Sequence, residues 1–303
     1  MINKIKSRNI LKIILRNLND KTNLNLVKYN NNLKKKLGIT IKDYIEYFNQ
    51  IEIEIIPKLT LDDEQEKFIN INKDNFIYHI YFNGNETEEI NKIFIEQDEN
   101  VTKIKVIINN IKNKSLKGLF KECHCIQEIK FIRFNISDVK DMSEMFSQCL
   151  SLKKINFLKF DTNLVNDMND MFCGCVSLLN LDLSKFITTN VTNMISMFAW
   201  CKKIKKLDLS NFNTTNVKYM TDMFYECVSL NYLNFSKFYF NSNTKTNIIS
   251  MFSGCNSLKK IELSSKVSDF YLQEFLEKTD INSKEVQINN KKCWGLLKDM
   301  YNI

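Results

Sequence analysis

The stretch Val191-Thr-Asn-Met-Ile-Ser-Met-Phe-Ala-Trp-Cys201 decides the fold, because its pattern recurs at a fixed interval along the chain. Each copy carries a Phe three residues before a Cys. The copies of this pair are Phe120/Cys123, Phe146/Cys149, Phe172/Cys175, Phe198/Cys201, Phe224/Cys227 and Phe252/Cys255. Successive cysteines are separated by 26, 26, 26, 26 and 28 residues. A fixed period of about 20–50 residues is typical of a solenoid, in which similar coils stack on one another.

Each copy contains two shorter periods. Leu181 and Leu183 alternate with polar residues, which predicts a short strand with one face inward. Residues at i, i+3, i+4 and i+7, one face of a helix, are Met194, Met197, Phe198 and Cys201. Asn190 and Asn216 precede two copies of this stretch and are expected to cap helices. The pattern therefore predicts coils of strand, turn, helix and turn, with a parallel concave sheet and convex helices.

The repeat resembles a known family. Residues 178–186 read Leu-x-x-Leu-x-Leu-Ser-x-Phe, and residues 188–201 read Thr-Thr-Asn-Val-x-x-Met-x-x-Met-Phe-x-x-Cys. This is similar to the BspA-like leucine-rich repeat of the DUF285 type, found in bacterial surface proteins and in many protist proteins. The resemblance covers roughly residues 116–265. It implies an α/β leucine-rich-repeat solenoid with a parallel concave sheet.

One departure from the common leucine-rich repeat concerns the position that usually holds an Asn bonded to the loop backbone. Here a Phe stands at that position in each coil: Phe134, Phe160, Phe186, Phe212 and Phe238. An apolar ladder is expected in place of the polar one, and each buried Phe would contribute about 1.5–3 kcal/mol. The loop backbone must then find its hydrogen bonds elsewhere.

The N-terminal part, residues 1–58, is expected to be a helical unit that ends near Pro57, the only proline. Residues 5–49 carry apolar stripes at helical spacing. Residues 8–37 resemble an F-box, which implies binding of a Skp1-like protein in a cullin ubiquitin ligase. The usual Leu-Pro and the late Trp of that motif are missing. The alternative is a helical cap or a separate small bundle.

Residues 59–115 are expected to form a β-rich cap over the first coil. Residues 76–82 alternate as a strand and lead into Asn83-Gly84, a typical hairpin turn. Two further strands are predicted at 93–95 and 104–108. Beyond the repeats, residues 266–303 are expected to form a C-terminal cap, with a helix at 269–278 and a strand at 286–288. The expected fold is thus a leucine-rich-repeat solenoid with a β-hairpin cap and an N-terminal helical unit.

Charge and apolar content argue against several classes of protein, namely membrane-spanning, secreted and nucleic-acid-binding proteins. The net charge of +8 is mild for 303 residues. No stretch approaches the ~20 apolar residues of a membrane span, and the N-terminus lacks the apolar core of a signal peptide. A cytoplasmic location and reduced cysteines are therefore expected. Lys34–Lys36 has no aromatic platform beside it, so nucleic-acid binding is not expected.

The sequence offers no catalytic constellation, so no enzyme and no cofactor are expected. The motif Cys123-His124-Cys125 suggests a metal site, but Cys123 is an inward position of the repeat and no second Cys/His pair stands at a useful spacing. A metal is therefore not expected. The anchor cysteines are expected to act as inert, buried small hydrophobes.

What remains is the surface of the concave sheet. Residues that alternate with the inward positions point outward, and stacking the coils arranges them in rows. The candidate partner-binding residues are Lys154, Asn180, Asp182, Lys206, Asp208, Tyr232, Asn234, Lys260 and Glu262. Asp182 would lie beside Asp208, and two like charges directly opposed are destabilising.

Non-catalytic binding of a protein through this concave face is the expected function, since solenoids use such extended surfaces for recognition. One alternative is an F-box-like substrate adaptor that recruits a Skp1-like protein through residues 8–37. Another is a secreted or surface adhesin of the BspA type.

Overall fold

The computed structural model describes residues 35, 50–58, 63–71, 77–89, 92–109, 115–134, 139–157, 160–238, 246–263, 287–288 and 291–292. The chain divides into two compact units, Met1–Gln50 and Ile51–Ile303. Apart from Lys35 and Gln50, the first unit lies outside the described residues. The predicted helices of residues 5–49 and the F-box-like segment 8–37 therefore stay predictions, as does the helix expected at 269–278.

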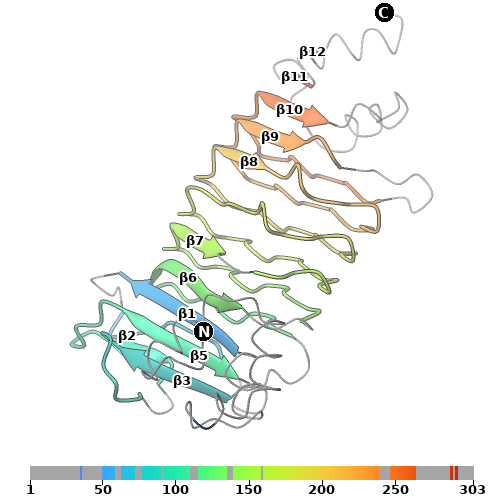
Figure 1. Cartoon of the computed structure of the whole chain (residues 1–303). Coiled ribbons are helices and arrows are strands. Elements are labelled where there is room, and N and C mark those ends of the chain that lie inside the picture. The colour runs from blue at the N-terminus through green and yellow to red at the C-terminus, as the bar shows by residue number, and fades with distance from the viewer. Residues whose placement is uncertain are drawn as a thin grey trace, which may run out of the picture. The chain divides into compact units, whose positions relative to one another are not determined.

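The described part of the second unit is built of short strands. Their bounds are β1 (Gln50–Pro57), β2 (Gln65–Lys67), β3 (Ile77–Phe82), β4 (Phe94–Glu96), β5 (Ile104–Asn109), β6 (Ile126–Phe134), β7 (Lys154–Phe157), β8 (Lys206–Asp208), β9 (Tyr232–Phe235), β10 (Lys260–Leu263), β11 (Gln287–Ile288) and β12 (Lys291–Lys292). One sheet has the order β3-β5-β1-β6-β7, a second β12-β11-β10-β9-β8, and β2 pairs with β4. The repeat coils stack from β6 towards β10 (Figure 1).

The strands of the face that the family resemblance implies to be concave, called the concave strands below, pair in parallel with the register that the repeat period requires. Glu128 lies opposite Lys154 in the pair β6–β7, and Tyr232 lies opposite both Lys206 and Lys260. The prediction of stacked parallel strands is confirmed for these coils. It is wrong for Leu181–Leu183, which form no strand, so the sheet is interrupted between β7 and β8 (Figure 1).

The convex side differs from the prediction. Residues 195–200 and their equivalents form successive turns instead of helices. Each coil has two residues with positive φ, four positions apart, such as Ser196 at 50° and Trp200 at 63°. A helix needs negative φ at every residue. The expected convex helices are therefore wrong within the repeats that the structure describes.

Hydrogen bonds explain why these turns replace helices. The N–H groups of Ser196, Phe198 and Trp200 donate to carbonyls 25 residues later, in the next coil, at 2.7–3.0 Å. The intervening N–H groups of Met197 and Ala199 donate three residues back, at 3.3 and 3.0 Å. Alternate N–H groups of this segment thus bond within the coil and to the next coil, so hydrogen bonds link each coil to the next on the convex side. We call this arrangement the turn ladder.

The predicted helix caps are also replaced by bonds between coils. The Asn190 side chain donates to the Asn163 carbonyl at 2.6 Å, and that of Asn216 donates to the Thr189 carbonyl at 2.7 Å. Because the following residues start turns instead of a helix, there are no unpaired helix N–H groups for these side chains to accept from. Both asparagines therefore act as links in the stack.

The N-terminal cap covers the first coil, as expected, but through different strands. β1 pairs antiparallel with β6, and Pro57, expected at a domain boundary, ends β1. Ile51, Ile53 and Ile55 alternate with glutamates and are fully buried, so Gln50–Pro57 is a strand within the range 1–58 that was expected to be helical. The expectation of a helical unit over residues 1–58 is therefore wrong at residues 50–57.

The predicted hairpin forms its turn, but its first strand pairs with a different partner. Asn83 and Gly84 do form a tight turn with φ values of 53° and 77°. However, β3 pairs with β5, not with β4, the strand that follows it. The side chain of Asn83 explains this choice, because its Oδ1 accepts from the Thr102 N–H at 2.8 Å and so fastens the turn to the start of β5. At the other end, the predicted strand at 286–288 is confirmed by β11, which pairs in parallel with β10.

Inward side chains form continuous ladders through the coils. The Phe of each Phe-x-x-Cys pair stacks on its neighbours, with centroids 5.4–5.6 Å apart and near-parallel rings. The second set, at the expected Asn position, is buried as predicted and includes Phe186, which lies 5.3 Å from Phe160 and 6.5 Å from Phe212. These ladders form one core and hold the outward residues in register.

Buried threonines supply the hydrogen bonds that the phenylalanines cannot. Thr188 is 1% exposed, donates to the Asn213 carbonyl at 2.9 Å and accepts from the Asn213 N–H at 2.8 Å. Thr162 bonds Ile187 of the next coil in the same two ways, at 2.8 and 2.7 Å. The loop backbone that lacks the usual Asn is therefore satisfied by a threonine from the preceding coil.

Candidate binding face

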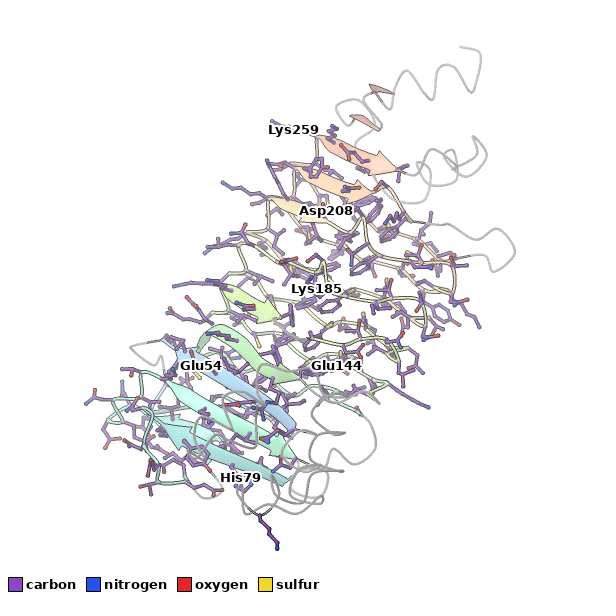
Figure 2. The ribbon with its side chains drawn as sticks, in the orientation of Figure 1. Glu54, His79, Glu144, Lys185, Asp208 and Lys259 are labelled. Carbon is purple, nitrogen blue, oxygen red and sulfur yellow. The ribbon has the colours of Figure 1, made fainter. Side chains whose placement is uncertain are left out.

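The candidate site residues lie where the sequence placed them, on the outward side of the concave segments. Lys154, Asn180, Asp182, Lys206 and Asp208 are exposed. The remaining four, Tyr232, Asn234, Lys260 and Glu262, are half-buried. Leucines and isoleucines between them point into the core. Figure 2 places Asp208 and Lys259 beside the C-terminal strands of the array.

The strand pairing breaks where two carboxylates would be opposed. In the repeat register Asp182 faces Asp208, and β8 pairs with β9 but not with Leu181–Leu183. The preceding coil keeps only an isolated bridge between Lys154 and Asn180. Like charges directly opposed in a sheet are destabilising, which accounts for an interruption at this level.

A side chain that the sequence reasoning missed bridges the interruption. Asn211 donates from its amide nitrogen to the carbonyls of Leu183 and Phe186, both at 2.9 Å. The equivalent positions hold Lys185 and Lys237. An Asn at a position that is Lys in both neighbouring coils is the signal in the sequence that could have revealed this local substitute for strand pairing.

Each central acidic residue is fixed by a short turn. Asp182 Oδ1 accepts from the Ser184 N–H at 2.9 Å, and Asp208 Oδ1 accepts from the Ser210 N–H at 2.9 Å. The bond to Ser184 holds the pKa of Asp182 below its usual range, so this carboxylate stays charged in moderately acidic solution. The acidic row of the face is therefore oriented before any partner arrives.

The C-terminal end of the face is a small polar cluster. Lys260 Nζ lies 3.0 Å from Glu262 Oε1 and 5.8 Å from the centre of the Tyr232 ring. Partial burial and a hydrogen bond with Glu262 raise the pKa of the Tyr232 hydroxyl. The cluster presents an aromatic ring between two lysines, because Lys206 pairs with the same Tyr232 from the other side. Aromatic residues such as tyrosine are enriched at protein interfaces.

The cysteines are built into the core and not into a reactive site. The thiols of Cys149, Cys175, Cys201, Cys227 and Cys255 each donate to the carbonyl of a Phe in the preceding coil, at 2.9–3.2 Å. Burial raises the pKa of all of them, to about 12 for Cys255. A thiol that stays protonated is a poor nucleophile and a poor metal ligand.

The Cys123-His124-Cys125 motif follows the same rule. Both thiols are buried, and burial raises the pKa of Cys125 to about 12. Across the described ranges, no three His, Cys, Asp or Glu side chains come together to hold a metal ion.

In the same ranges no helix is long and apolar enough to cross a membrane.

Comparison with known proteins matches this architecture to one family. The family model described as "Mycoplasma protein of unknown function, DUF285" matches residues 79–162, 114–238 and 151–266. A solved leucine-rich repeat protein from Bacteroides ovatus is 16% identical to this chain, and the match covers 65% of this chain and 71% of that protein. Its TM-score of 0.22 is too low to indicate a shared fold. No protein with curated annotation matches. Because the family matches together run from 79 to 266, more than half of the chain, the protein belongs to the DUF285 family of BspA-like leucine-rich-repeat proteins.

Proposed function

We propose that the protein is a non-catalytic binding module that recognises another protein through the concave face of its repeats. The observation that carries this proposal is the contrast between the two sides of each concave segment. One side is a continuous apolar core, and the other carries polar residues, most of them charged, that are not the same in every coil. Side chains that vary from coil to coil on an invariant scaffold provide recognition without altering the fold.

The face also has the composition of a recognition surface. Its acidic side chains are oriented by their own turns, and the Tyr232–Lys260–Glu262 cluster is held together by an ion pair and a cation–π contact. Ordering such side chains in advance lowers the entropy that binding must overcome. By contrast, the thiols described above are protonated and buried, so they are poor nucleophiles for covalent catalysis. Their state therefore favours a binding role over a catalytic one.

The proposal is tested by affinity capture from native cell extract. The bait is the whole chain, compared with Lys206→Glu/Asp208→Lys, a double variant that reverses two charges of the concave face and keeps the net charge. The matched control, Glu122→Lys/Lys218→Glu, reverses two exposed charges outside the concave segments. The proposal predicts a partner that is retained by the control and lost with the concave variant.

Two results would count against it. A partner retained equally by both variants would move recognition away from the concave face. A partner that binds residues 1–58 alone would assign the function to the N-terminal segment. It would then favour the alternative function, an F-box-like substrate adaptor. Circular dichroism and a thermal melt of each bait establish that any loss is not a loss of folding.

A further inference from the structure

A row of lysines lies at the start of the concave segments, in every second coil. It consists of Lys153–Lys154, Lys205–Lys206 and Lys259–Lys260, and we call it the lysine ridge. The coils between them carry Leu179–Asn180 and Asn231–Tyr232 at the same positions. The backbone bonds Leu179 N–H to Lys153 O, Asn231 N–H to Lys205 O and Lys259 N–H to Asn231 O establish this register.

Most lysines of the ridge form no ion pair among the described residues, although Glu128 lies opposite Lys154 in the strand register and Glu262 pairs with Lys260. Within the described ranges Lys154, Lys205, Lys206 and Lys259 make no ion pair, and all four are exposed. Elsewhere on the same repeats the chain does pair its lysines: Lys117 and Lys121 both contact Glu144, the former at 3.0 Å. The ridge is therefore a place where cations are left for an external anion.

The spacing of the ridge selects the form of that anion. Adjacent coils are about 4.8 Å apart, so lysine pairs in alternate coils are about 10 Å apart. A polyproline-II helix rises about 3.1 Å per residue and has three residues per turn, so every third side chain lies on one side at about 9 Å intervals. A segment with an acidic residue at every third position would place one carboxylate at each lysine pair.

The coils between the lysine pairs suit such a segment as well. The polyproline-II backbone makes no internal hydrogen bonds and leaves its carbonyls free. The exposed Asn180 amide lies between two lysine pairs and can donate to these carbonyls. Polyproline-II segments also dock on aromatic side chains, and the Tyr232 ring is half-buried beneath Lys260.

The neighbouring row argues against a nucleic acid. Asp182, Asp208 and Glu262 stand two residues beyond the ridge, about 7 Å along each segment. A phosphate backbone carries closely spaced negative charge, about one charge per 1.7 Å in a duplex. It would meet this acidic row as well as the lysines, whereas a peptide places its carboxylates only where its sequence does.

Resting on the proposed function of the concave face, we infer that the lysine ridge binds an extended acidic segment of a protein, with carboxylates at every third residue. The segment runs across the coils, and each of its carboxylates meets one lysine pair. The rows between contribute hydrogen bonds to its backbone.

The inference is tested with labelled synthetic peptides and fluorescence anisotropy at physiological salt. The first peptide carries Glu at every third position in a Pro-rich background. The second has the same composition with its Glu residues in one block, and the third carries Gln in place of Glu. A single-stranded RNA and a duplex DNA of matched charge complete the set. The proteins are the whole chain, Lys206→Glu, and the control Lys218→Glu.

The spaced peptide is expected to bind at least tenfold more tightly than the block peptide, and the Gln peptide not to bind. Lys206→Glu is expected to weaken the spaced peptide at least tenfold, and Lys218→Glu less than twofold. Equal binding of spaced and block peptides, tighter binding of either nucleic acid, or no peptide binding at all would overturn the inference. If the peptides fail while affinity capture still finds a partner lost with Lys206→Glu/Asp208→Lys, the proposed function stands and only the acidic segment is wrong.

Discussion

At the scale of single residues, each coil separates packing from backbone bonding. Phe186 fills the core, while Thr188, two residues later, bonds the loop backbone of the next coil. The buried phenylalanine could be predicted from the repeat alone. The role of the threonine could not, because a Thr between exposed residues in a loop gives no signal of burial in a single sequence.

Phe186→Ala is expected to lower the free energy of unfolding by about 3–5 kcal/mol, since it leaves a cavity between two stacked rings. Lys185→Ala, at an exposed neighbouring position, is expected to change it by less than about 0.5 kcal/mol. Urea denaturation of the two variants measures both. Equal effects would mean that the inward and outward assignment is wrong.

Thr188→Val keeps the shape of the side chain and removes its hydroxyl. It is expected to cost about 1–3 kcal/mol, because the N–H and carbonyl of Asn213 lose their partner inside the protein. Thr189→Val, at the exposed next position, is the matched control and should cost less than about 0.5 kcal/mol. A negligible cost for Thr188→Val would contradict the bonding role assigned to the buried threonines.

The buried thiols predict how stability depends on pH. Their pKa values are raised in the folded protein, so the folded state holds its protons more tightly than the unfolded chain, whose thiols titrate near about 8.5. Their contribution to stability is full below that pH and is lost as the pH rises towards the folded pKa values. Each thiol should cost about 1 kcal/mol between pH 7.5 and 9.5.

Urea denaturation at the two pH values tests this expectation. Cys201→Ala removes one fully buried thiol and should make the loss of stability between them smaller by about 1 kcal/mol. The same loss in the variant and in the unaltered protein would show that Cys201 does not contribute in this way.

At the scale of elements, the convex segment shows what a hydrophobic pattern can and cannot determine. Met194, Met197, Phe198 and Cys201 are all buried, as the spacing i, i+3, i+4 and i+7 predicted. The same spacing also suits overlapping four-residue turns, since Met197 N–H bonds Met194 O and Cys201 N–H bonds Phe198 O. The hydrophobic pattern determines which residues face inward, whereas the hydrogen bonds between coils favour turns over a helix.

Two glycine substitutions distinguish the turn ladder from a helix. Ser196 has a φ of 50°, so Ser196→Gly relieves left-handed strain and should leave stability unchanged or raised within about 1 kcal/mol. In a helix the same change would cost roughly 0.5 kcal/mol or more. Ala199→Gly, a buried position without positive φ, should cost about 1 kcal/mol in either structure. Thermal melts report both, and a clear destabilisation by Ser196→Gly would contradict the turn ladder.

At the scale of the whole molecule, the repeat array and its outward face were accessible from the sequence, because period, spacing and alternation repeat in every coil. The cap was not. Its strands pair across long stretches of chain, β1 with β6 and β3 with β5, and nothing in a single sequence specifies such partners. The break in the concave sheet at Asp182 and Asp208 depends on a contact between coils, which the sequence indicated only as an unfavourable pair.

The proposed binding of a protein partner at the concave face can be tested by crosslinking. The most direct measurement places a photo-reactive amino acid at Asn180 on the concave face or at Trp200, an exposed position of the turn ladder in the same coil. Each variant is irradiated in native extract and the adducts are identified by mass spectrometry. Binding at the concave face predicts one specific adduct from Asn180 that is absent from Trp200. A specific adduct from Trp200 and none from Asn180 would contradict it.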